Sequence, residues 1–287
     1  MGRWGTVARC LAVLLACGCA AMATAADDLP AQQLVRSGAH VDAAAEAQVK
    51  ALRREVFEAS RYVMADGAVL PYRLLPPPTL VPGQRYPLVV VLHGSGAVGN
   101  DNRAQLGALA LSWSAPSLRQ RYPAFVLVPQ FGERSANYVA ASDGALASAP
   151  GPGVARLQAL VDTLLTQKPI DPARVYVMGF SMGASTAWNA LQSRRGRYAA
   201  AVMFSGIAPD RAGAAALADV PLLVVHGNAD TNNPIDADRA MVAALKAQHA
   251  PALHWREYDG MDHQVPDTML LATEWRDWLW AQQRPRP

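Results

Sequence analysis

Ser181 lies at the centre of the pentapeptide GFSMG, residues 179–183, which directly follows an apolar run at 174–178. A G-x-S-x-G sequence between a strand and a helix predicts a very sharp turn that lifts the serine hydroxyl above the sheet. Glycines two residues before and after the serine are needed, because Cβ atoms would clash where the helix packs against the strand. A hydroxyl exposed in this way can attack a carbonyl carbon once a base has taken its proton.

The acid and the base that such a serine requires follow it in the sequence. Asp230 comes just after the apolar run 222–226, and His263 comes just after the run 254–258. Both runs are predicted strands, so all three side chains are expected at the carboxyl-terminal edge of one sheet. A working triad needs hydroxyl, imidazole and carboxylate each within about 3 Å of the next. We therefore predict Ser181 as nucleophile, His263 as base and Asp230 as acid.

Other acidic and basic side chains near these positions have competing interpretations. Asp236 precedes an Ala-rich helical segment and is better explained as its N-cap. Asp259 and Asp262 flank the candidate base and compete weakly for the role of the acid. His226 lies inside the strand that leads to the candidate acid, where a local hydrogen bond that holds the following loop is expected. Two further histidines, at a helix end and a strand start, are assigned structural or surface roles: His249 and His254.

The segment HGSG, residues 93–96, follows a predicted strand and matches the HGGG-type segment that helps to bind a developing oxyanion. The backbone N–H of Ser95 is the predicted donor, and Gly94 is the alternative. The N–H of Met182, directly after the nucleophile, is the predicted second donor. The side chain of His93 is assigned a structural place beneath this loop, because a catalytic histidine before the serine contradicts the order of the triad.

Between these segments, short apolar runs alternate with helical stretches, the pattern of a parallel sheet covered on both faces. A hairpin precedes them, with strands at 59–65 and 69–75 joined by Asp66-Gly67. The parallel strands are expected at 87–92, 125–128, 175–179, 200–204, 222–226 and 254–258. Helices are expected at 41–58, 105–120, 154–167, 182–193, 237–248 and 268–281. The predicted fold class is α/β, with a mostly parallel eight-stranded sheet and helices on both faces.

One insertion breaks the alternation of strands and helices. Residues 131–153 are rich in Ala, Ser, Gly and Pro and follow the carboxyl end of a strand, where ligands bind in open α/β sheets. A loop of this length without its own secondary structure is either functional or mobile. The expected organisation is a signal peptide at 1–26, an N-terminal helical lead-in at 27–58 and a catalytic domain at 59–287.

The first 26 residues differ from the rest of the chain. Two arginines precede an apolar stretch at 10–23, and the small residues at 23–25 match a signal-peptidase site. The pattern predicts export, to the periplasm or outside the cell. The alternatives are an uncleaved membrane anchor and a lipid anchor at Cys17 or Cys19. All three cysteines lie in this segment, so its removal would leave no thiol nucleophile, disulfide or thiolate metal site.

The composition narrows the choice of partners. Of the 287 residues, 51% are hydrophobic and 17% are charged, which is typical of a globular protein with ample core material. The net charge is +3, and no Lys/Arg cluster with interleaved aromatic residues is present, so nucleic acid is not an expected partner. No cofactor, no metal and no membrane span in the mature chain are expected. The oligomeric state stays open.

These motifs together resemble secreted α/β-hydrolases of the esterase and predicted-peptidase type. That group includes polyhydroxybutyrate-depolymerase-like and feruloyl-esterase-like enzymes and the phospholipase/carboxylesterase group. The resemblance is carried by residues 86–96, 100–106, 170–176, 179–183, 226–230 and 257–263, and by Trp188. It implies the α/β-hydrolase fold and a triad of Ser181, Asp230 and His263. It also implies that the amides of Ser95 and Met182 form the oxyanion hole.

The expected function is hydrolysis of a carboxylic ester through an acyl-enzyme. A small serine peptidase or amidase is the alternative of the same fold. A hydrolase fold that has become a binding module is a third interpretation, although no triad member is missing. Asn137, Tyr138 and Trp188 are candidates for lining the substrate pocket, with a core position as the other interpretation of Trp188. Many related proteins carry aromatic residues in the loop after the strand that ends at Pro129-Gln130, whereas this chain has Ser135-Ala136-Asn137-Tyr138 and an Ala/Ser stretch there, so their substrate preference does not transfer.

Overall fold

The computed structural model describes residues 1–2 and 29–285. The predicted signal peptide therefore lies almost wholly outside the described residues. Within the described part, nine strands form one sheet in the order β1-β11-β10-β9-β8-β4-β5-β3-β2. They are β1 (Gln32–Val35), β2 (Glu58–Val63), β3 (Val69–Leu75), β4 (Tyr86–Leu92), β5 (Phe125–Pro129), β8 (Ile170–Phe180), β9 (Ala200–Phe204), β10 (Leu222–Gly227) and β11 (Leu253–Tyr258). In this sheet β3 alone runs opposite to the other strands, so its pairs with β2 and β5 are antiparallel and the remaining pairs are parallel. The sheet is therefore mostly parallel, as predicted.

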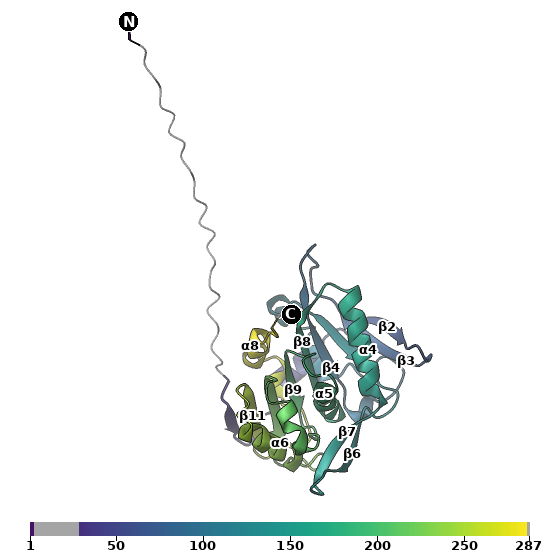
Figure 1. Ribbon diagram of the computed structural model, residues 1–287, viewed down its shortest axis with the longest axis vertical. Helices are drawn as coiled ribbons and strands as arrows, with labels where there is room; N and C mark the ends of the chain where they lie inside the picture. The colour runs from purple at the N-terminus through teal and green to yellow at the C-terminus, as the bar shows by residue number, and fades with distance from the viewer. Residues whose placement is uncertain (3–28, 286–287) are drawn as a thin grey trace.

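Helices cover both faces of the sheet (Figure 1). One face carries α4 (Pro152–Gln167), α5 (Met182–Ser193) and α6 (Asp236–Ala247). The other carries α1 (Ala43–Lys50), α2 (Ala108–Ser112), α3 (Pro116–Arg121), α7 (Asp267–Leu270) and α8 (Glu274–Ala281). Short 3₁₀ turns complete the connections: η1 (Arg54–Val56), η2 (Ser95–Ala97) and η3 (Arg211–Ala216). Among the described residues, no helix is long and apolar enough to cross a membrane.

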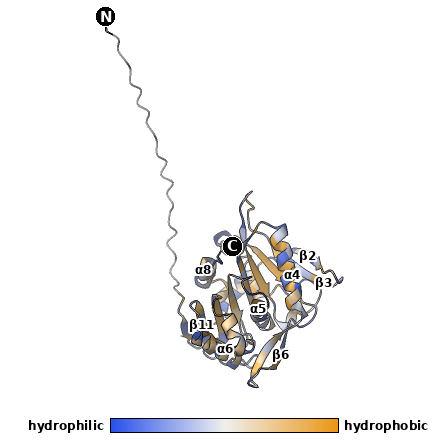
Figure 2. Cartoon of the chain, in the orientation of Figure 1, coloured by the Kyte–Doolittle hydropathy of each residue, from blue (hydrophilic) through white to orange (hydrophobic). Residues whose placement is uncertain are grey.

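The central strands are apolar along their whole length because each face of the sheet has its own core. In β4, Leu88 and Val90 belong to the cluster beneath α4 and α5, while Val89 and Val91 belong to the cluster beneath α2 and α8. Every residue of this strand is buried. A half-exposed strand alternates between apolar and polar residues, whereas a strand covered on both sides reads as a continuous apolar run. Figure 2 shows these strands as the most hydrophobic part of the molecule.

The predicted helical lead-in at 27–58 is wrong in two respects. It contains strand β1, which pairs in parallel with β11 along the residues Gln32 to Val35 and adds a ninth strand to the predicted eight. It is therefore part of the same domain as the rest of the sheet. Its helix is shorter than expected, because α1 begins after Asp42, whose side chain caps it by accepting from Ala45 N–H, and ends at Lys50.

The insertion at 131–153, predicted to lack secondary structure, contains a hairpin of β6 (Ala136–Ala140) and β7 (Leu146–Pro150). Its turn uses Gly144 at a φ of 83°, a conformation that favours glycine. The hairpin is held from outside, since Ser148 N–H donates to the carbonyl of Ala208 and Asn189 of α5 donates to the Ser148 hydroxyl. These tertiary bonds compensate for a sequence with weak strand propensity.

Two predicted helices are each divided in the structure. The segment 105–120 forms α2 and α3, because Pro116 lacks an N–H and occupies the first turn of a new helix. The segment 268–281 forms α7 and α8, and the guanidinium of Arg276 donates to the carbonyls of Leu270 and Ala272 near the break. Strand β8 begins at Ile170, earlier than the predicted residue 175, and reaches Phe180.

Candidate active site

The turn at Ser181 joins β8 to α5 with a backbone φ of 57° and ψ of −124°. This conformation costs about 1–3 kcal/mol for a residue with a side chain. Hydrogen bonds hold it, because Ser181 N–H donates to the Phe204 carbonyl at 2.9 Å and Ser185 N–H donates back to the Ser181 carbonyl at 3.1 Å. A Cβ on Gly183 would collide with the backbone of Leu92. Glycine is therefore needed where α5 packs against β4, as the pentapeptide predicted.

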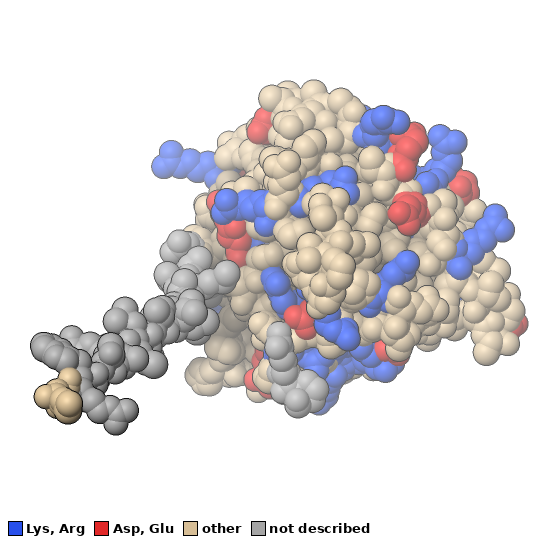
Figure 3. Space-filling model, turned by 90° about the horizontal axis from the view of Figure 1, so that it is seen from above, with Lys and Arg blue, Asp and Glu red and all other residues tan. Residues whose placement is uncertain are grey.

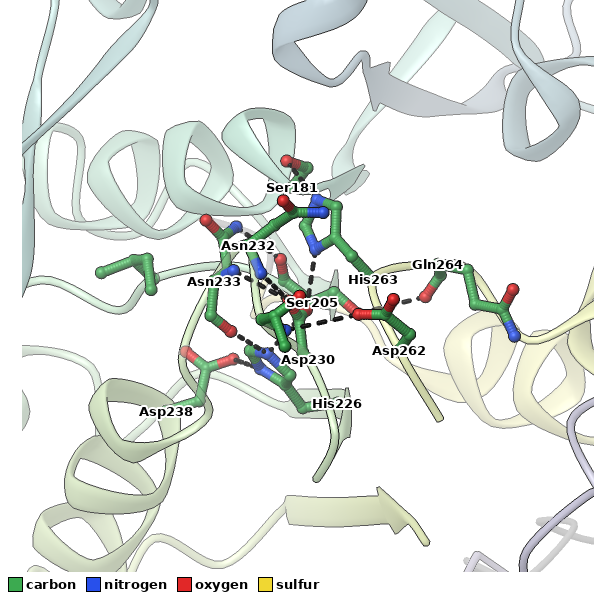
Figure 4. Close-up of polar contacts among 12 residues, drawn as sticks. Ser181, Ser205, His226, Asp230, Asn232, Asn233, Asp238, Asp262, His263 and Gln264 are labelled. Carbon is green, nitrogen blue, oxygen red and sulfur yellow. Dashed lines mark hydrogen bonds and ion pairs between the residues drawn. The ribbon is translucent and has the colours of Figure 1, made fainter. Parts of the chain in front are cut away.

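The imidazole of His263 connects Ser181 to Asp230 (Figure 4). Its Nε2 lies 2.8 Å from Ser181 Oγ, and its Nδ1 lies 2.7 Å from Asp230 Oδ2. Asp230 follows β10 and His263 follows β11, and these loops touch, since a Cβ on Gly227 would collide with the Met261 carbonyl. The structure thus brings the three residues of the predicted triad into one hydrogen-bonded series.

The carboxylate of Asp230 is buried and receives several hydrogen bonds. Its Oδ1 accepts from the backbone N–H groups of Asn232 at 2.9 Å and Asn233 at 2.8 Å. Its Oδ2 accepts from His263 and lies 3.2 Å from Nε2 of His226. Burial raises the pKa of this carboxyl group, but the hydrogen bonds from the two histidines and the backbone outweigh burial and hold the pKa well below its ordinary value. Asp230 is therefore ionised at neutral pH.

A second histidine–carboxylate pair lies behind Asp230 (Figure 4). The side chains of His226 and Asp238 are fully buried, with His226 Nδ1 2.9 Å from Asp238 Oδ2. The Nε2 atom of His226 lies 2.9 Å from the carbonyl oxygen of Asn233. Burial lowers the pKa of His226, but hydrogen bonds to Asp230 and Asp238 outweigh it and raise the pKa to about 9. The local hydrogen bonds expected for His226 are present.

Sequence reasoning missed Asp238. It named Asp236 as the cap of the following helix, but Asp236 is the first residue of α6 and Ile235 precedes it. A signal for Asp238 did exist, because a histidine inside an apolar strand needs a polar partner when it is buried. The first turn of the helix that follows the same loop was the place to search for it.

The two predicted oxyanion donors begin helical turns on either side of the nucleophile. Ser95 is the first residue of η2, and Met182 is the first residue of α5. The first N–H groups of a helix have no partner within the helix and lie at its positive end. The loop between β4 and Ser95 lies against Ser181, since a Cβ on Gly94 would be 3.5 Å from Ser181 Cβ. The positions of Ser95 and Met182 thus suit the role predicted for them, and Gly94 stays the alternative to Ser95.

His93 supports this loop from below. Its Nδ1 lies 2.8 Å from the carbonyl oxygen of Gly94, and its Nε2 accepts from the N–H of Phe131 at 3.0 Å. A carbonyl oxygen can only accept, so Nδ1 carries the proton and the ring is neutral. Burial lowers the pKa of His93, in keeping with that form. The structural place predicted for this side chain agrees with these contacts.

Gln130, which the sequence did not single out, holds the far side of the same loop. It is fully buried, and its Nε2 donates to the Ala97 carbonyl at 3.2 Å and to Asp101 Oδ1 at 2.8 Å. Its Oε1 accepts from the N–H of Asn102. The same Asp101 oxygen also accepts from the N–H of Arg103. One amide side chain therefore ties together the turn that carries Ser95.

A mainly apolar pocket of about 440 Å³ opens beside His263. Its walls come from the oxyanion loop, α2, α7 and Phe180, whose ring lies 4.8 Å from the His263 ring between centroids. Glu46 and Lys50 of α1 also line it and form an ion pair at 2.6 Å. Three residues were predicted to line the substrate pocket. Asn137 and Tyr138 lie in β6 and do not line this pocket, and Trp188 is buried in the core.

The remaining charges give no second site of this kind. Within residues 29–285, no group of three or more His, Cys, Asp or Glu side chains is placed to hold a metal ion. On the face drawn in Figure 3, basic side chains are interspersed with acidic ones and do not form a continuous groove.

Comparisons with known proteins agree with this fold. Residues 153–274 match the phospholipase/carboxylesterase family. A thermostable esterase shares 28% identity and a TM-score of 0.71 over 80% of this chain and 64% of its own. A puromycin-hydrolysing peptidase of Mycobacterium tuberculosis shares 18% identity and a TM-score of 0.57 over 76% of this chain and 37% of its own.

A ferulic acid esterase shares 14% identity and a TM-score of 0.57 over 78% of this chain and 96% of its own. The chain thus spans less than two thirds of the length of the esterase and of the peptidase. No curated protein matches the chain significantly. The sequence match and the structural likeness together identify the fold as that of an α/β-hydrolase.

Proposed function

We propose that this chain, an α/β-hydrolase of the esterase and peptidase type, is an exported serine hydrolase that cleaves carboxylic esters. The observation that carries the proposal is the hydrogen-bonded series from Ser181 Oγ through His263 to Asp230, at 2.8 Å and 2.7 Å. Two helix-initiating amides, at Ser95 and Met182, flank the nucleophile.

The chemistry follows from these positions. Ser181 Oγ attacks the ester carbonyl while His263 Nε2 accepts the hydroxyl proton, and ionised Asp230 stabilises the resulting imidazolium. The carbonyl oxygen becomes an oxyanion and accepts hydrogen bonds from the amides of Ser95 and Met182. The tetrahedral intermediate then expels the alcohol, which takes the proton from His263 and leaves an acyl group on Ser181. Water, deprotonated by the same imidazole, releases the acid and restores the serine.

The pocket beside His263 supports an ester with an apolar group as the substrate. Its volume falls in the range of sites for small molecules, roughly 300–1,000 Å³. Its walls are mostly apolar, and the charges of Glu46 and Lys50 are paired with each other. Burying each methylene of an acyl chain there is worth about 0.8 kcal/mol.

The decisive experiment is hydrolysis of p-nitrophenyl esters by the wild type and by Ser181→Ala. We expect the variant to lose at least about 10³-fold in kcat while keeping the thermal unfolding temperature, since the hydroxyl is the nucleophile. Ser193→Ala, at the far end of the same helix, is the matched control and keeps its activity. Wild-type rates from Ser181→Ala would refute the serine mechanism.

Amide hydrolysis is the second candidate, because the structural neighbours include peptidases as well as esterases. Matched ester and anilide substrates with the same acyl group separate the two functions. An esterase hydrolyses the ester far faster, whereas a peptidase must protonate a poorer leaving group and is built to do so. Comparable kcat/KM values on the two substrates would favour the peptidase.

Occupancy of the pocket can be tested separately from the chemistry. Ala108→Trp places a large ring at the pocket, and we expect kcat/KM for octanoate esters to fall at least about tenfold relative to acetate esters. Ala47→Trp, on α1 but outside the pocket lining, is the control. Equal losses for both acyl lengths would place the acyl group elsewhere.

Export belongs to the same proposal, with cleavage of the signal peptide directly after Ala25 or after Ala26. Intact mass of the protein secreted by a suitable bacterial host tests it. A mature chain that begins near Asp27 supports the signal peptide. An added diacylglycerol mass on Cys17 or Cys19 would show the lipid-anchored alternative, and an intact N-terminus would refute export by cleavage.

A further inference from the structure

We propose that His226 and Asp238 are positioning residues that extend the triad to five side chains, from Ser181 through His263 and Asp230 to His226 and Asp238. The proposal rests on the serine chemistry above and deepens it. The geometry is a continuous series of polar contacts, in which Asp230 Oδ2 contacts His263 Nδ1 at 2.7 Å and His226 Nε2 at 3.2 Å. His226 Nδ1 then contacts Asp238 Oδ2 at 2.9 Å.

The partners of His226 fix its protons. Nε2 faces two acceptors, the carbonyl oxygen of Asn233 and the carboxylate of Asp230, so this nitrogen carries a hydrogen. Nδ1 faces a carboxylate oxygen of Asp238. One further proton must lie between those two atoms, because a bare nitrogen lone pair opposite a carboxylate would leave two acceptors facing each other in a buried site. The pair therefore holds one proton more than a neutral histidine beside an ionised aspartate.

The surroundings favour the ionised form of this pair, imidazolium with carboxylate. Asp238 is the third residue of α6, within the first turn of a twelve-residue helix, where the positive end of the helix dipole stabilises an anion. Asp230 places a second negative charge against the same ring. The raised pKa of His226, about 9, agrees with a ring that keeps both protons at neutral pH.

This arrangement changes the base that activates Ser181. Oδ2 of Asp230 contacts two imidazole rings, so the negative charge of Asp230 is partly compensated by the His226 imidazolium. His226 Nε2 and His263 Nδ1 both contact Oδ2 of Asp230. When both rings carry a positive charge, these two nitrogens therefore lie within about 6 Å of each other, which is close enough for strong repulsion. The second pair therefore places a cation behind Asp230 that opposes the build-up of a second positive charge on the imidazole of His263.

Other charged groups near His263 are few and do not touch its ring nitrogens. Asp262 precedes it and accepts from the N–H of Thr231. Glu46, Lys50 and Asp267 line the pocket that His263 also lines. The ring nitrogens of His263 contact Ser181 and Asp230. The charge of His226, which contacts the same oxygen of Asp230, therefore acts on His263 through a single shared atom.

The test is the pH profile of kcat/KM for a p-nitrophenyl ester, measured for wild type, His226→Gln, Asp238→Asn and the double variant. Removing the imidazolium leaves Asp230 uncompensated and stabilises protonated His263. We expect the acid limb of His226→Gln to move to higher pH by roughly one to two units, from Coulomb's law at an effective dielectric constant of about 20. Asp238→Asn removes an anion and leaves the imidazolium of His226 facing Asp230, so its limb moves to lower pH. The double variant lacks both charges, so its limb moves upward less far than that of His226→Gln.

Asp236→Asn is the matched control, since Asp236 is on the same helix, is highly exposed and forms a surface ion pair with Arg239. It leaves the limb in place. A purely structural role for His226 or Asp238 lowers the unfolding temperature without moving the limb, and that result would overturn the proposal. An equal shift in the control, or an upward shift in the double variant larger than that of His226→Gln, would do the same.

The wild type provides a measurement that does not depend on the variants folding or on the substrate. In protein labelled with ¹⁵N at histidine, NMR spectra are expected to show both ring nitrogens of His226 protonated at pH 7.5. This signal is expected to be the same in Ser181→Ala. Detection of a neutral His226 ring would refute the proposal even if esterase activity is confirmed. A protonated ring in a protein without esterase activity would instead refute only the proposed function.

Discussion

Replacing Gly183 by alanine tests the closest contact on which the site depends. The added Cβ would collide with the carbonyl group of Leu92 and would lie 2.8 Å from the carbonyl oxygen of His93. Ordinary contacts of this kind are about 3.4 Å or longer, so the end of β4 must move away by several tenths of an ångström to about 1 Å. That strand end leads directly into the loop with Ser95.

Two losses are therefore expected from Gly183→Ala. Overpacking against a backbone costs about 1–3 kcal/mol, which lowers the unfolding temperature by roughly 3–10 °C for a domain of this size. A displacement near 1 Å at the oxyanion loop lowers kcat by about 10². Thermal unfolding and steady-state ester hydrolysis measure the two effects on the same sample.

Gly107→Ala is the control for the unfolding temperature alone, because a Cβ there meets nothing within 4 Å and the backbone φ is −76°, whereas Gly107 also lines the pocket beside His263. It is expected to keep its unfolding temperature within about 1 °C, as a surface change away from strain does. If Gly183→Ala matched the wild type in both stability and kcat, the close packing of α5 on β4 would not be what positions the nucleophile.

Three further predictions follow from buried polar groups. Because folding raises the pKa of His226 from 6.5 to about 9, its stabilisation is complete below about pH 6.5 and is lost as the pH rises to about 9; the wild-type unfolding temperature should fall across that interval, and the fall should flatten in His226→Gln. The guanidinium of Arg276 lies over the rings of Trp113 and Trp275 and donates to several carbonyls, so Arg276→Lys should cost about 3 kcal/mol or more, measured by urea unfolding, since lysine cannot reproduce the planar donor set. Gln130→Ala should lower kcat by about tenfold or more with little change in KM, because it frees the turn that carries an oxyanion donor; unchanged kcat would remove that turn from the catalytic machinery.

The meeting of Ser181, Asp230 and His263 was predictable because each follows an apolar run long enough to be a buried strand. Parallel strands place their carboxyl ends at one edge, so three distant segments converge without any knowledge of side-chain contacts. The elbow glycines were predictable for a steric reason that the structure bears out at Gly183. The catalytic roles of these residues stay predictions that the substitutions above test.

The parts that could not be predicted depend on tertiary contacts. Strand β1 has the sequence QQLV, which carries no strong strand signal and becomes a strand by pairing with β11. The β6–β7 hairpin is rich in Ala and Ser, and its bonds to Ala208 and Asn189 come from segments far along the chain. Asp238 has the sequence pattern of an ordinary residue in a first helical turn, and only the fold brings it to His226.

The N-terminal segment has a consequence for how this protein can change. Glu46 and Lys50 line the pocket from α1, and β1 pairs that segment with the far edge of the sheet, while the candidate catalytic residues come from loops after β4, β8, β10 and β11. Mutation or recombination within about residues 30–57 can therefore reshape the pocket wall and leave Ser181, His263 and Asp230 untouched. Under the proposed function, substrate choice and catalysis are to that extent separately heritable, and a library confined to this segment is a direct way to change the substrate of the proposed hydrolase.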